Sequence, residues 1–89
     1  KTDERRKAIR EIEKQSAQLR QTEMFIETPY RNDSMLSDLV ATLQPATRLC
    51  IAADLTLPGE TLITKTVKQW RSEPFTIGKR PCVFLLLAK

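Results

Sequence analysis

The sequence predicts a small α/β domain, and the order of its apolar segments carries this prediction. Asp3 to Arg20 has apolar residues at helical spacing and is followed by a short apolar strand, Glu23 to Thr28. A second helix, with apolar residues from Met35 to Leu43, leads to another apolar strand, Arg48 to Leu55. Strand, helix and strand within about 30 residues form a βαβ unit, whose two strands run parallel with a right-handed crossover.

Proline and capping residues mark the borders of these elements. Pro29 stops the first strand and Pro45 ends the second helix, because proline cannot continue the backbone hydrogen bonding of either. Asn32, Asp33 and Ser34 are all good N-cap residues, so we expect one of them to start the second helix.

The second half of the chain predicts two further strands. Leu57 to Glu60 is a turn, and Thr61 to Thr66 is rich in β-branched residues, so it reads as a strand antiparallel to the one before it. A short helix from Val67 ends near Glu73, and Cys82 to Leu87 forms the last and most hydrophobic strand. The chain of 89 residues is long enough for one domain of this kind.

Composition excludes several classes of site. The chain has no histidine, so a Ser–His or Cys–His nucleophile is impossible, and two isolated cysteines do not make a zinc site. We therefore expect neither a catalytic nucleophile nor a metal. No apolar run approaches the roughly 20 residues of a membrane span. Cys50 and Cys82 lie inside apolar runs, which predicts reduced thiols and a cytoplasmic protein.

Positive charge is concentrated toward the end of the chain. From Leu62 onward Glu73 is the single acid, whereas the basic residues are Lys65, Lys68, Arg71, Lys79, Arg80 and Lys89. Such a surface can attract polyanions such as RNA, or it can be an ordinary solvated surface. The few aromatic residues do not alternate with basic ones as in a nucleic-acid platform, so the sequence leaves both interpretations open.

The segment from Glu27 to Arg31 is the strongest candidate for a functional turn. It lies at the end of a strand of the βαβ unit, and ligands of open α/β sheets gather outside the carboxyl ends of strands. Glu27 and Arg31 are close enough to form an ion pair across the turn. This pair can serve a ligand site or be purely structural.

Glu27-Thr28-Pro29-Tyr30-Arg31, after an apolar strand, resembles a recurrent motif of the tetrapyrrole methylase superfamily, most closely the ribosomal RNA cytidine 2′-O-methyltransferase group. The similarity continues in order through Asp54-Leu55-Thr56, Glu60-Thr61, the helix from Val67 to Arg71 and the final strand, and so spans essentially the whole chain. The chain departs from that group near Ala53 and Leu57, where its members carry basic residues.

The resemblance implies a protein with two dissimilar α/β domains and S-adenosylmethionine in the cleft between them. Residues 1–89 would be the C-terminal domain, without the N-terminal domain that makes most of the donor contacts. The implied fold is a four-stranded mixed sheet in the order first, fourth, second, third, with helices packed on it. The fourth strand would lie between the two parallel strands and run antiparallel to both.

The resemblance also implies how the domain works. It would supply one wall of the cleft, and its donor contacts would lie at strand ends, at Ala52, Ala53, Asp54, Leu87 and Ala88. Its partners would be its own N-terminal domain, an RNA substrate and a second subunit. The isolated chain would be inactive and bind the donor weakly or not at all. The alternative is an RNA-binding or dimerisation module without catalysis.

Overall fold

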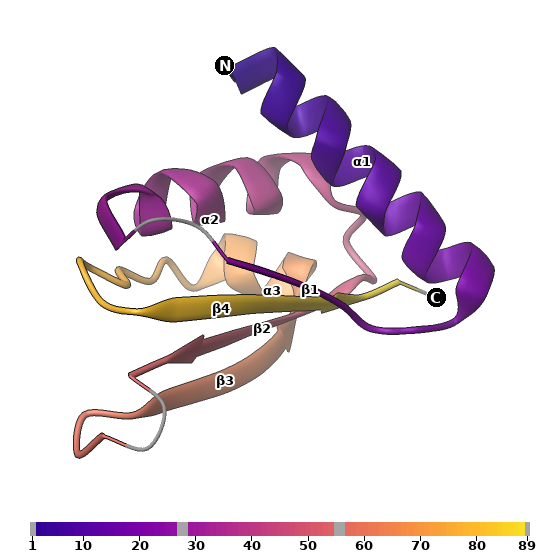
Figure 1. Cartoon of the computed structure of the whole chain (residues 1–89). Coiled ribbons are helices and arrows are strands. Elements are labelled where there is room, and N and C mark those ends of the chain that lie inside the picture. The colour runs from indigo at the N-terminus through magenta and orange to yellow at the C-terminus, as the bar shows by residue number, and fades with distance from the viewer. Residues whose placement is uncertain (1, 27–28, 55–56, 89) are drawn as a thin grey trace.

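The computed structural model describes residues 2–26, 29–54 and 57–88, which form one sheet and the helices packed on it (Figure 1). In chain order the elements are α1 (Thr2–Leu19), β1 (Glu23–Ile26), the 3-10 turn η1 (Pro29–Arg31), α2 (Asn32–Thr42), β2 (Arg48–Ala53), β3 (Thr61–Thr66), α3 (Val67–Ser72) and β4 (Cys82–Leu87). The predicted order of helices and strands is confirmed. The last residues predicted for the first two strands, Glu27, Thr28 and Leu55, lie outside the described residues.

The strand order is β1-β4-β2-β3, as predicted, with β4 inserted between β1 and β2. Each neighbouring pair is antiparallel. The prediction of a mixed sheet is therefore wrong. β1 and β2 do run in the same direction, but β4 separates them, so no parallel pair of strands is hydrogen-bonded within the described sheet.

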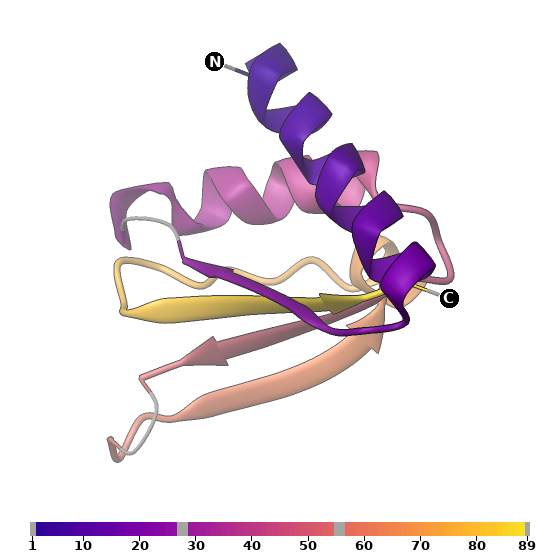
Figure 2. The ribbon, with the colours of Figure 1, turned by 45° about the vertical axis from the view of Figure 1, so that its right-hand side comes forward.

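One face of the sheet is covered by helices and carries the core. Figures 1 and 2 show α1 and α2 crossing the same side of the sheet. The core-facing side chains of β4 are Cys82, Phe84 and Leu86, which alternate with half-buried residues as a strand covered on one face requires. Phe84 stacks on Phe25 of β1 with ring centroids 5.5 Å apart. The helices, the C-cap of α2 and β2 also contribute to the core, with Ile9, Leu36, Leu39, Leu43, Leu49, Ile51, Val67 and Trp70.

Polar contacts fasten α1 to the rest of the domain. The buried carboxylate of Asp38 on α2 accepts hydrogen bonds from Arg5 Nε at 2.6 Å and from Arg6 Nε at 3.1 Å. At the other end of α1 the buried hydroxyl of Ser16 donates to the Gln21 carbonyl and accepts from the Ala88 N–H. The helix is therefore held at both ends, over α2 and over the end of β4.

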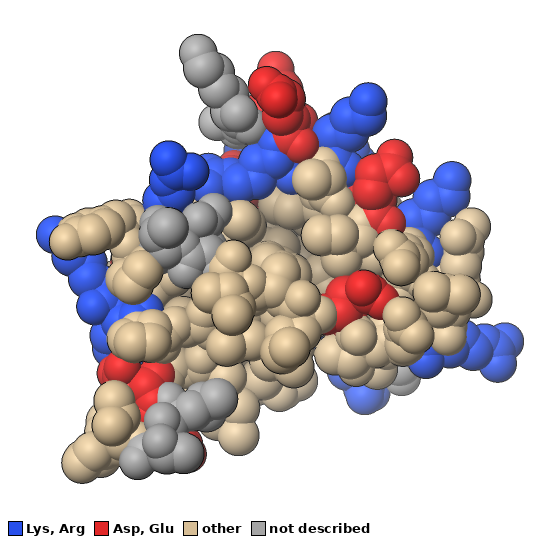
Figure 3. Space-filling model, viewed as in Figure 1, with Lys and Arg blue, Asp and Glu red and all other residues tan. Residues whose placement is uncertain are grey.

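The opposite face of the sheet is open and largely apolar. The strand register aligns Ile26, Val83, Ala52 and Leu62 in one row across all four strands, on the side away from the helices. Ile26 is 72% exposed and Leu62 is 63% exposed. Uncharged atoms fill the middle of the space-filling view, whereas Lys and Arg side chains lie around its edge (Figure 3).

Within the part of the chain that the structure describes, no helix combines the length and the apolar character that crossing a lipid bilayer requires.

Candidate functional site

An open pocket of about 480 Å³ lies on the uncovered face, where β1 and β2 end and β4 begins. Ile26, Val83 and Ala52, neighbours in the row across the sheet, line it together with Pro29, Asp54, Leu57, Pro81 and Cys82. Asp54 is the only one of these that carries a formal charge. The pocket can therefore accept a flat or apolar group that presents one hydrogen-bond donor or positive charge.

Asp54, directly after β2, has a backbone conformation that non-glycine residues seldom adopt. Its φ is +52°, in the left-handed region, which Asp tolerates better than most residues. Its N–H donates to the Pro81 carbonyl at 2.9 Å, and its carbonyl accepts from the Leu57 N–H at 3.0 Å. These two bonds hold the backbone of Asp54 in place, and Asp54 lines the pocket.

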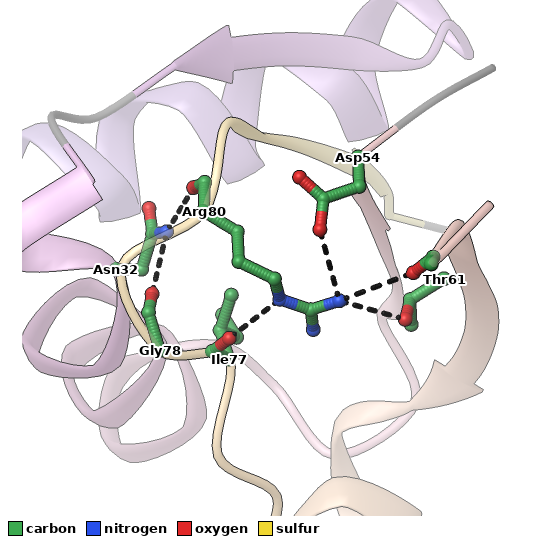
Figure 4. A network of polar contacts seen from close by, with 7 residues as sticks. Asn32, Asp54, Thr61, Ile77, Gly78 and Arg80 are labelled. Atoms are coloured by element: carbon green, nitrogen blue, oxygen red, sulfur yellow. Dashed lines mark hydrogen bonds and ion pairs between the residues drawn. The ribbon is translucent and has the colours of Figure 1, made fainter. Parts of the chain in front are cut away.

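Arg80 connects the segments that surround Asp54 (Figure 4). Its Nε donates to the Ile77 carbonyl at 2.7 Å, and its Nη1 lies 3.1 Å from Thr61 Oγ1, 3.4 Å from the Gly59 carbonyl and 3.5 Å from Asp54 Oδ2. The short bonds to Ile77 and Thr61 carry most of the interaction, because hydrogen bonds weaken toward 3.5 Å. Arg80 thus joins the loop before β4 to the turn between β2 and β3.

The first residue of α2 holds the same loop. The helix begins at Asn32, one of the three residues predicted to start it, although Arg31 occupies the N-cap position and forms no side-chain cap bond. The Asn32 side chain reaches the loop before β4, where its Nδ2 donates to the carbonyls of Gly78 at 3.0 Å and Arg80 at 2.6 Å. Figure 4 shows Asn32 and Arg80 on the two sides of one loop.

The residues predicted to contact a methyl donor fall into two separate groups. Ala52, Ala53 and Asp54 lie at the end of β2, and two of them, Ala52 and Asp54, line the pocket. Leu87 and Ala88 lie at the opposite end of the sheet, because β4 runs antiparallel to β2 and Leu87 pairs with Arg48, the first residue of β2. Five residue steps of about 3.3 Å separate the two ends, or about 17 Å.

Leu87 and Ala88 have different surroundings. They border a second hollow of about 490 Å³ with Ala17 and Arg20, and the Ala88 N–H is used by Ser16. Ala52, Ala53 and Asp54 thus cannot share one small site with Leu87 and Ala88.

The motif from Glu27 to Arg31 is partly described. Pro29 lines the pocket, and Tyr30 is 80% exposed. Arg31 is exposed and forms no ion pair with any residue in the described ranges. The predicted ion pair between Glu27 and Arg31 involves a residue outside those ranges and stays a prediction.

Sequence reasoning missed the first residues of β4. Pro81, Cys82 and Val83 border the pocket because an antiparallel strand brings its start, not its end, to the carboxyl ends of its neighbours. The predicted antiparallel direction of β4 was enough to place its first residues at this edge of the sheet. No sequence pattern indicated a role for Arg80, because most of its contacts are with segments that are distant in the chain.

The two thiols lie on opposite faces of the sheet. Cys82 pairs with Ala53, three residues from Cys50, so their side chains point in opposite directions. Both cysteines are free, in agreement with the predicted reduced state. Burial raises the pKa of the Cys82 thiol to about 11, although the Arg80 guanidinium acts in the opposite direction.

This pKa predicts unequal reactivity. At pH 8 about one Cys82 thiol in a thousand is ionised, and the thiolate is the nucleophile. Iodoacetamide should therefore modify half-buried Cys50 in the folded chain and leave Cys82 intact, as read by mass spectrometry of peptides. Labelling in urea, where both thiols are exposed, is the control. Equal labelling of both thiols in the folded chain would contradict this assignment.

The same pKa has a consequence for stability. The folded chain keeps the Cys82 proton to a higher pH than the unfolded chain, in which the thiol has its ordinary value of 9.0. The burial of the protonated Cys82 thiol therefore contributes fully to the free energy of unfolding below pH 9. This contribution is lost as the pH rises toward 11.

No cluster of three or more metal-ligating side chains occurs among the described residues. No protein-family model matches the chain, and comparison with curated proteins finds no match. What the pocket can do is thus judged from its own geometry: an apolar floor, one carboxylate among the described residues and an uncovered sheet face.

Proposed function

We propose that this chain is the C-terminal domain of a cytoplasmic S-adenosylmethionine-dependent methyltransferase of the tetrapyrrole methylase superfamily. In the complete protein it forms one wall of the cleft for donor and substrate, and ribosomal RNA or a related molecule accepts the methyl group. The observation that supports this best is the pocket beside Asp54, which is formed on one side only. Three strands make its floor, and no helix of the described chain covers it.

The chemistry of methyl transfer agrees with such a wall. Transfer from a sulfonium to an acceptor is an in-line displacement, in which positioning and exclusion of water supply much of the rate. This domain then needs no nucleophile of its own. Ala52 and Val83 provide apolar contact, and Asp54 provides a hydrogen-bond acceptor for the donor.

The inserted strand β4 is a second support. The superfamily resemblance implies the order first, fourth, second, third, and direct pairing of β1 with β2 would have contradicted it. The sheet has the implied order. The order alone does not define a function, since one fold can carry many activities.

The test is to fill the pocket in the complete protein. Val83→Trp puts an indole on the pocket floor at a half-buried position that can accept it without disturbing the core. We expect transfer of tritiated methyl groups from S-adenosylmethionine to ribosomal RNA to fall more than about tenfold at subsaturating donor, equivalent to about 1.4 kcal/mol.

Leu87→Trp makes the same change on the same face of β4, but at the far end. The activity of Leu87→Trp shows how much the second predicted group of donor contacts, Leu87 and Ala88, contributes to methyl transfer. Wild-type activity in Val83→Trp, or a larger loss in Leu87→Trp, would contradict the assignment of the donor to the pocket. No methyl transfer by the wild-type protein would contradict the proposed function itself.

A further inference from the structure

An exposed aromatic ring stands next to the candidate pocket. Tyr30 follows Pro29, which lines the pocket, and is 80% exposed in the 3-10 turn after β1. Aromatic side chains are usually largely buried. Because Tyr30 is mostly exposed, its ring contributes little to the core. Lys79 places its Nζ 5.1 Å from the centre of the Tyr30 ring, within the range of a cation–π interaction.

The loop that carries Lys79 is held firmly on both sides. Gly78, with φ of +79°, allows the turn before it, and the Asn32 side chain bonds the Gly78 and Arg80 carbonyls that flank Lys79. The Asp33 carboxylate accepts from the backbone N–H groups of Ile77 and Gly78 at 2.7 and 3.1 Å. Lys79 itself is exposed and is presented from a rigid loop.

Two cationic side chains flank Tyr30: Arg31 is the next residue, and Lys79 lies over the ring. Lys79 and Arg31 are exposed, and neither forms an ion pair with a residue that the structure describes. The nearby Asp33 uses both oxygens for the loop, and Asp54 faces Arg80. In Figure 3 cationic side chains lie on the left of the view, with acidic side chains directly below them.

We propose that Tyr30, Lys79 and Arg31 form a binding site for a segment of single-stranded RNA. A base stacks on the Tyr30 ring, and Lys79 and Arg31 contact the phosphates on either side of that base. Single-stranded nucleic acid offers both a π face and repeated negative charge, the two features that an exposed ring beside cationic side chains can bind. The choice of RNA rests on the proposed function, since the site would hold the acceptor strand beside the donor pocket.

The test measures binding without a methyl donor. Fluorescence anisotropy of a labelled RNA strand of about 12 nucleotides is compared with heparin, a polyanion without bases. Tyr30→Leu removes the π face and should weaken RNA binding about tenfold, because stacking contributes about 1–3 kcal/mol per base, and should leave heparin binding unchanged. Tyr30→Phe keeps the ring and should bind RNA like the wild type.

The cations are tested by the salt dependence of binding. Lys79→Gln should weaken both ligands and lower the slope of log K against log salt by about 0.7, the value for one phosphate contact on a single strand. Lys68→Gln makes the same change at an exposed lysine of α3 and should leave the slope unchanged.

Full RNA affinity in Tyr30→Leu, or an equal loss in Lys68→Gln and Lys79→Gln, would overturn the site. Absence of RNA binding by the wild-type chain would overturn it as well, as would tighter binding of an acidic peptide than of RNA. Because no donor is present, these outcomes are independent of methyl transfer, and the site and the proposed function can fail separately.

Discussion

Replacing Phe84 by alanine should remove about 3–5 kcal/mol of stability, the range for truncating a buried phenylalanine. Phe84 is fully buried in β4, which has a neighbouring strand on both sides, and its ring stacks on Phe25. A domain of this size has about 5–15 kcal/mol of total stability, so the variant should be largely unfolded at modest urea concentrations. The cavity would lie where β1, β4 and the helices meet.

The chain supplies both a probe and a control for this experiment. Trp70 is the only tryptophan, is buried, and donates its indole N–H to the Leu49 carbonyl, so its fluorescence reports unfolding. Leu85→Ala truncates the next residue of β4, which is half-buried on the open face and should cost about 1 kcal/mol. Equal urea midpoints for Phe84→Ala and Leu85→Ala would show that the helix-covered face does not dominate the stability.

Much of the fold was predictable because local patterns determine it. The limits of β3 and β4 follow from β-branched and apolar runs bounded by turns, and both are found as predicted. The βαβ pattern of the first half gives β1 and β2 the same direction. The position of β4 between them came from the family resemblance, since no local pattern specifies which strands pair.

The candidate site was predicted only in part, for a geometric reason. With the resemblance in hand, donor contacts were expected at the ends of β2 and β4 alike. This expectation included Leu87 and Ala88, although β4 runs in the opposite direction to β2. The start of that strand, at Pro81 and Val83, is what lies beside Ala52.

Contacts between distant segments could not be predicted from residue types. Asn32 and Asp33 are typical capping residues, but the 3-10 turn before α2 frees their side chains to hold the loop before β4. Lys79 and Tyr30 are far apart in the sequence and meet because this loop is held against the start of α2. A search for alternating basic and aromatic residues along the chain cannot detect such a pair.

Arg80→Ala should lower the free energy of unfolding by about 2 kcal/mol, because it removes hydrogen bonds of a charged group that is mostly buried. For a domain of this length the melting temperature should fall by about 10 °C. Lys68→Ala, at an exposed position, should change the stability by less than about 0.5 kcal/mol. Arg80→Lys should recover only part of the loss, because one ammonium group cannot reproduce the bonds of a planar guanidinium to Ile77 and Thr61.

A double-mutant cycle with Thr61→Val separates the connection between segments from a local effect of Arg80. If Arg80 fastens the turn between β2 and β3 to the loop before β4, the two substitutions should be coupled by about 1 kcal/mol. The amides of Leu57 and Glu60, which bond the Asp54 and Leu57 carbonyls, should then exchange faster in Arg80→Ala, while amides of β2 and β4 keep their protection. Additive effects, or unchanged exchange at these two amides, would mean that the turn bearing Asp54 holds its shape without Arg80. Coupled effects would mean that Arg80 positions Asp54, and donor binding by the complete protein should weaken in the same variants.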